Sequence, residues 1–149
     1  MRELNIEFLE LYRRIDRFIK DAYGSTDGVS EYIRQMEQND GKGRIYVATW
    51  KNAYGKLKHL RWIRNQLVHE VGYDSDICER ADYDWLISFG NQLYSATDPL
   101  SVMRKAEKLA NKNRPAYSPS YTGQRRRYVQ IEKKTLWQKI REFFGGRSE

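Results

Sequence analysis

Three side chains suited to phosphate chemistry lie close together in the segment RNQLVHE. Arg64 carries a guanidinium that keeps its charge and pairs well with phosphate oxygens. Asn65 offers an amide that can orient a ligand, and His69 can accept or donate a proton near neutral pH. Together these types favour chemistry at a phosphodiester. We therefore take Arg64, Asn65 and His69 as candidate catalytic residues.

A single helix, expected from Thr49 to Gly72, positions these residues. Its apolar seam is predicted at Trp50, Ala53, Leu57, Leu60, Leu67 and Val71, and Arg64 occupies a seam position. Asn65 and His69 are four residues apart, about 40° around a helix axis, so they share a face. The same face extends back to Lys58 and Trp62, which become candidate binding residues, either for RNA or for a second copy of the chain.

Apolar periodicity and capping residues predict four more helices. The first is expected to end at Gly24 and the second before Asn39, and Asp40 to Arg44 is expected to be a loop that reverses the chain. Asp76 and Glu79 are predicted to form a capping box for the next helix, and Asp98 with Pro99 to begin the last. Their inner faces are listed here in order: Leu4, Phe8, Leu11, Ile15, Phe18 and Ala22; Val29, Tyr32, Ile33 and Met36; Leu86, Phe89 and Leu93, flanked by Trp85 and Tyr94; Leu100, Met103, Ala106 and Ala110. The predicted fold is all-α, an antiparallel up-and-down bundle of four to five helices over residues 1–111.

Residues 112–149 differ from the bundle in composition and charge. Residues 1–111 hold 17 Lys and Arg against 17 Asp and Glu, whereas residues 112–149 hold 10 against 3, so the net charge of +7 belongs to this tail. The tail begins as a linker containing Arg125, Arg126 and Arg127, which are candidate binding residues for a polyanion. It then forms a predicted amphipathic helix with Leu136, Trp137, Ile140, Phe143 and Phe144 on one face.

The Arg-Asn-x-x-x-His motif, residues 64–69 on the third helix of the predicted bundle, resembles the signature of the HEPN family. The resemblance implies a homodimer in which both copies of the motif line one cleft, and RNA cleavage without a metal. It implies that a ribose 2′-oxygen attacks the adjacent phosphorus, with His69 moving protons, Arg64 balancing charge and Asn65 orienting the phosphate or the imidazole. A toxin or defence role follows from the same analogy.

The sequence also bears on cofactors, on location in the cell and on alternative functions. The sequence has no cluster of Asp and Glu and no Cys/His set at ligand spacing, so no metal and no cofactor is expected. Charges near the start and the single Cys78 favour a cytoplasmic protein. A noncatalytic HEPN-fold module that binds RNA, a nucleotide or a protein partner remains the alternative. A third function stays open, an adaptor that contacts a protein or a membrane surface through residues 128–145.

Overall fold

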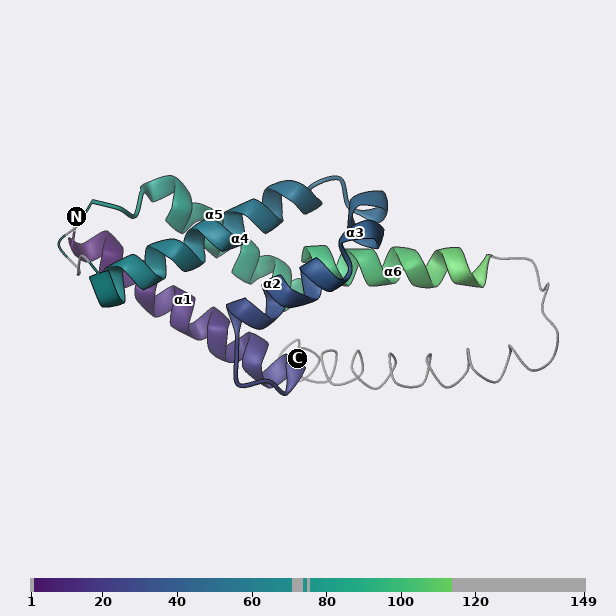
Figure 1. Ribbon diagram of the computed structural model, residues 1–149, viewed down its shortest axis with the longest axis horizontal. Helices are drawn as coiled ribbons and strands as arrows, with labels where there is room; N and C mark the ends of the chain where they lie inside the picture. Colours follow the sequence, from purple (N-terminus) through teal and green to yellow (C-terminus); the bar gives the residue numbers. More distant parts are fainter. Residues whose placement is uncertain (1, 71–73, 75, 114–149) are drawn as a thin grey trace.

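The computed structural model describes residues 2–70, 74 and 76–113, which form an all-α helical bundle without a strand in these ranges (Figure 1). The predicted fold class is confirmed. The helices are α1 (Arg2–Tyr23), α2 (Val29–Gln38), α3 (Asp40–Tyr46), α4 (Trp50–Asn65), a π-helical turn η1 (Gln66–Glu70), α5 (Arg80–Ser95) and α6 (Pro99–Lys112).

The apolar stripes of α1 and α2 were predicted correctly. Phe8, Ile15, Phe18 and Ala22 of α1 are buried, and Gly24 follows the helix with φ +60°, a conformation that a residue without a Cβ adopts at low cost. The buried residues of α2 are the four predicted, Val29, Tyr32, Ile33 and Met36. α1 packs against α5 and α2, and α2 packs against α4.

The predicted loop from Asp40 to Arg44 was wrong, because this segment forms the helix α3. Two glycines suggested a turn, but Gly43 is buried and lies directly against the indole of Trp50. Trp50 is 1% exposed, and its Nε1–H donates to Asp40 Oδ1 over 3.1 Å. Packing of a large aromatic side chain therefore outweighs the low helix propensity of glycine. α3 also lies against α6 through the ion pair of Lys42 with Glu107.

The motif helix is consequently the fourth α-helix of the chain. One position of its predicted apolar seam was wrong: Ile63, and not Arg64, is buried there. Ile63 is fully buried and Arg64 only half-buried, because a guanidinium is costly to remove from water while a neighbouring apolar side chain can take the seam. Regular α-helix was expected to Gly72, but it ends at Asn65 and continues as the π-helical turn η1. The predicted seam residue Val71 lies outside the described residues.

The capping box of α5 was predicted three residues too early. Glu79 is the N-cap and Asp82 its reciprocal partner, with Asp82 Oδ2 accepting the Glu79 backbone N–H over 3.1 Å. Cys78 is buried just before the helix begins. The inner face Leu86, Phe89 and Leu93 is buried as predicted, with Trp85 half-buried beside it and Tyr94 43% exposed.

α6 begins as predicted, with Asp98 as N-cap and Pro99 in the first turn. Asp98 is 3% exposed and accepts hydrogen bonds from Tyr32 Oη over 2.5 Å and from Ser101 Oγ over 2.5 Å. Burial raises the pKa of Asp98, against the opposing effect of these hydrogen bonds. The carboxyl therefore joins α2 to the start of α6 at the centre of the bundle.

This raised pKa predicts a pH-dependent contribution to stability. The folded state binds the Asp98 proton more tightly than the unfolded chain, whose aspartate titrates near pH 3.9, so the contribution of Asp98 to stability rises as the pH falls from neutral towards about 4. An Asp98→Asn variant keeps an N-cap and loses the titration. Urea unfolding of both proteins between pH 4 and 7 should show their difference changing in favour of wild type at low pH. A difference that is constant with pH would contradict this assignment.

None of the helices in the described part of the chain is both long enough and apolar enough to cross a lipid bilayer. α6 extends to Lys112, where the predicted boundary of the bundle lies. The predicted linker and amphipathic helix lie outside the described residues.

Candidate functional site

α4 is a basic helix within a bundle of balanced charge. Its sequence, WKNAYGKLKHLRWIRN, contains five Lys and Arg residues and no Asp or Glu. The zero net charge of residues 1–111 conceals the positive charge of this one helix, which is evident when the charge of each helix is taken separately. Lys58, Arg61 and Arg64 recur every three residues in its C-terminal half, so a polyanion bound there would meet favourable charge.

Arg64 lies where α4 faces α1. Its Nη1 donates to the side-chain Oδ1 of Asn65 over 3.0 Å. On α1, burial and the charge of Asp16 raise the pKa of Tyr12, and the nearby positive charge of Arg64 acts in the opposite direction. The guanidinium is thus oriented by its neighbour in the motif and remains half-exposed, so it can still meet an anion.

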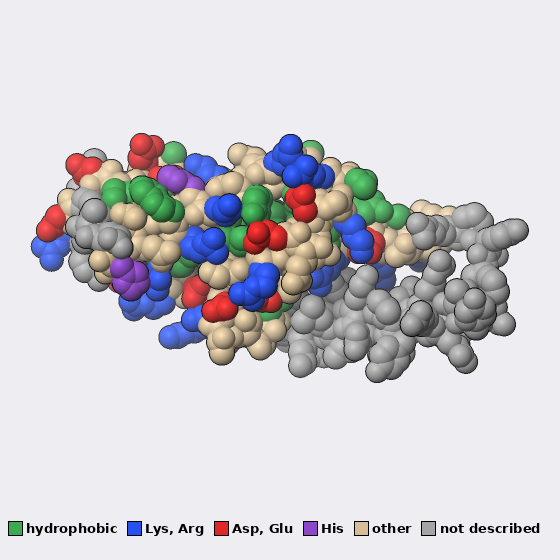
Figure 2. All heavy atoms as spheres, in the orientation of Figure 1, with side chains coloured by type: hydrophobic (Ala, Val, Ile, Leu, Met, Phe, Trp, Pro, Cys, Tyr) green, Lys and Arg blue, Asp and Glu red, His purple; other side chains and the backbone are tan. Residues whose placement is uncertain are grey.

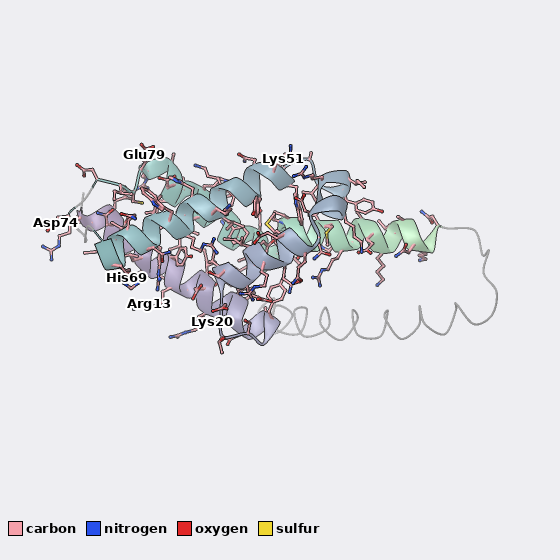
Figure 3. The ribbon with its side chains drawn as sticks, viewed as in Figure 1. Arg13, Lys20, Lys51, His69, Asp74 and Glu79 are labelled. Atoms are coloured by element: carbon pink, nitrogen blue, oxygen red, sulfur yellow. The ribbon has the colours of Figure 1, made fainter. Side chains whose placement is uncertain are left out.

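His69 is exposed and lies in the π-helical turn η1. A π-helix closes i→i+5 hydrogen bonds and often occurs at functional sites. The α-helical angle used to place Asn65 and His69 on one face therefore does not hold across residues 66–70. Figure 3 shows His69 at the same end of the bundle, and on the same side, as Arg13 of α1.

The structure brings Arg64 and Asn65 into direct contact. Of the row predicted along the helix, Lys58, Trp62 and Asn65 lie in regular α-helix, whereas His69 lies beyond it in η1. Lys58 is exposed, and its Nζ lies 5.2 Å from the ring centre of Tyr54. Trp62 is 49% exposed and stacks on His59, with ring centres 5.9 Å apart and planes 17° apart. Lys58 and Trp62 are thus accessible, each beside an aromatic or imidazole ring of the same helix.

His59, the other histidine of α4 and η1, has two partners in the structure. Besides Trp62, its Nε2 lies 3.5 Å from Asp82 Oδ1 of α5, and Lys56 Nζ lies 3.4 Å from the same oxygen. Both histidines of the chain are visible in Figure 2, one beside exposed hydrophobic side chains and the other beside Lys or Arg side chains. The pairing of α4 with Asp82 crosses 23 residues, so no local pattern could have indicated it.

Cys78 is buried, as expected from its small apolar character. Burial, together with the smaller effects of the Asp82 and Glu79 charges, raises its pKa to about 11. The thiol is therefore protonated at neutral pH and is a poor nucleophile.

Within the described ranges, no three His, Cys, Asp or Glu side chains converge in a way that could hold a metal ion. The candidate binding residues Arg125, Arg126 and Arg127 lie outside those ranges.

Comparison with known proteins places the chain in a family. Searches of curated proteins and of solved structures each returned no significant match. The model of one family matches residues 6–142, which include the bundle from α1 to α6 and most of the basic tail. The chain therefore belongs to the family of unknown function DUF6548.

Proposed function

We propose that the protein is a metal-independent endoribonuclease that binds RNA along α4 and cleaves it at the Arg64, Asn65 and His69 site. One observation carries the proposal: an accessible histidine follows an oriented Arg64–Asn65 pair at the end of a helix that has only cationic charges. The resemblance of residues 64–69 to the HEPN signature supports the same activity. A toxin or defence role, and action in the cytoplasm, are proposed from the sequence alone.

The proposed reaction uses the RNA itself as nucleophile. The ribose 2′-oxygen forms a bond to the adjacent phosphorus, the bond from phosphorus to the 5′-oxygen breaks, and a 2′,3′-cyclic phosphate and a 5′-hydroxyl result. One group accepts the 2′-proton and another gives a proton to the leaving 5′-oxygen. Arg64 balances the charge that develops on the phosphoryl oxygens, and Asn65 holds the guanidinium or the phosphate in place.

Two proton-transfer groups are needed, and we propose that a homodimer supplies them as two copies of His69. Val68, the neighbour of His69, is 43% exposed, so an apolar side chain beside the histidine is available for contact with a second copy. The sequence of η1, QLVHE, contains no Lys or Arg, so two copies can approach there without repulsion between basic side chains. The two sites would then share one cleft.

A noncatalytic RNA-binding module is the second candidate. The hydrogen bond from Arg64 to Asn65 supports it, because a guanidinium oriented in this way can hold a phosphate in a binding groove without cleaving the RNA. The cationic helix supports both functions to the same degree. The difference between them is therefore whether bound RNA is cut.

The test uses the full-length protein and several labelled single-stranded RNAs in buffer containing EDTA. We expect cleavage products to accumulate with wild type. RNA that is bound and stays intact would overturn the catalytic proposal in favour of the binding module. Protein that neither binds nor cleaves any of these RNAs would overturn both.

A further inference from the structure

The stack of Trp62 on His59 is an exposed aromatic surface that the proposed cleavage reaction does not use. The two rings are nearly parallel, with planes 17° apart and centres separated by 5.9 Å. Trp62 keeps 49% of its surface exposed, which leaves room for another flat ring. An indole of this kind suits stacking with a nucleobase, since every base offers a π face.

A buried carboxylate from another helix contacts the stack. The Asp82 side chain is 5% exposed, and its Oδ1 lies 3.5 Å from His59 Nε2. Its other oxygen, Oδ2, accepts the backbone N–H of Glu79 at the start of α5. His59 is therefore held between α5 and Trp62. A ring surface that is held in this way loses less conformational entropy on binding than a free side chain.

The charge around the stack favours RNA over a second copy of the chain as its occupant. Lys58 is exposed and lies one residue before His59, and α4 carries cations without acids. The carboxylate that contacts the stack, Asp82, is 5% exposed and also pairs with Lys56. Two copies of this helix that met at Trp62 would place like charges together. A nucleic acid strand would instead bring phosphates to the cations and bases to the indole.

We propose that the Trp62–His59 stack is a binding site for one unpaired base of single-stranded RNA, with His59 acting as a positioning residue. This inference rests on the proposed function, because it assigns a subsite next to the cleavage site. Trp62 in α4 and His69 in η1 are seven residues apart in one continuous helical segment. A strand that stacks a base on Trp62 can therefore also reach His69.

The experiment measures the affinity of full-length variants for a labelled single-stranded RNA and for a duplex of the same sequence. Trp62→Ala should weaken single-strand binding by about 5- to 150-fold, since stacking contributes on the order of 1–3 kcal/mol per base. Trp62→Phe should keep most of the affinity. His59→Ala should cause a smaller loss. Binding of the duplex, whose bases are already stacked, should change little.

Two further measurements separate stacking from other roles of Trp62. The slope of log affinity against log salt should stay unchanged in Trp62→Ala, because no cation is removed. Tyr94→Ala, which removes a 43% exposed aromatic side chain from α5, is the matched control and should bind RNA like wild type. Circular dichroism checks that each variant is folded.

Several outcomes would overturn the proposal. One is single-strand affinity unchanged in Trp62→Ala, and another is an equal loss for single strand and duplex. A variant that becomes monomeric while wild type is dimeric would place Trp62 in a subunit interface instead. Cleavage is recorded on the same samples, so the two claims can fail separately: Trp62-dependent binding without cleavage refutes only the nuclease, and cleavage unaffected by Trp62 refutes only this subsite.

Discussion

Replacing His69 with alanine is expected to lower the rate of RNA cleavage by about 10²- to 10⁴-fold, the usual contribution of a general acid or base. His69 is exposed at the end of the helix that carries Arg64 and Asn65, so its removal should not disturb the core. Single-turnover cleavage of a labelled RNA in EDTA measures the effect. Affinity for RNA should change far less than the rate, because the cations of α4 remain.

The control for this substitution is Asn52→Ala, which truncates an exposed polar side chain of the same helix, more than four turns before His69. It should cleave RNA at the wild-type rate. His69→Ala protein with full cleavage activity would show that His69 does not transfer protons. A loss of activity accompanied by loss of helicity would show a structural role for His69 instead.

Gly43→Ala is expected to cause a large loss of stability. A Cβ built at this position would lie 2.0 Å from Cε2 of Trp50, far inside van der Waals contact. The indole is 1% exposed and hydrogen-bonded to Asp40, so it cannot move aside cheaply. We expect a loss of about 3 kcal/mol in the free energy of unfolding, the upper part of the range for overpacked cores.

Gly41→Ala provides the matched comparison. Gly41 lies in the same helix, is exposed, and has no atom within 4 Å of the added Cβ. Alanine should therefore stabilise α3 by roughly 0.5–1 kcal/mol, its advantage over glycine within a helix. Urea unfolding of both variants decides the matter. Equal effects of the two substitutions would show that the contact between Gly43 and Trp50 is not important for the fold.

The helices were predictable where a repeated apolar stripe defines them, as in α1 and α2, since such a stripe must be buried. Errors arose where one tertiary contact decides the local structure. Asp40 to Arg44 looks like a loop until Trp50 is placed on Gly43, and nothing within that segment indicates the contact. Ile63 and Arg64 are adjacent candidates for one seam position, and the high cost of burying a charge selects Ile63.

The candidate site was also predictable only in part. Arg64, Asn65 and His69 could be named from their types and spacing, and the charge of α4 is written in its sequence. The π-helical turn that carries His69 has no sequence signal as clear as a cap or a stripe. Contact between His59 and Asp82 depends on how α4 packs beside the start of α5, so only the tertiary structure reveals it.

The central claim, that this protein cleaves RNA through its 2′-oxygen, is tested most directly by a DNA strand that contains a single ribonucleotide. Mass spectrometry of the products formed in EDTA should show one cut, on the 3′ side of that ribonucleotide, with a 2′,3′-cyclic phosphate on one fragment and a 5′-hydroxyl on the other. The same strand without the ribonucleotide should stay intact. An uncut strand, fragments with 5′-phosphates, or the same cut made by His69→Ala protein would contradict the proposed mechanism.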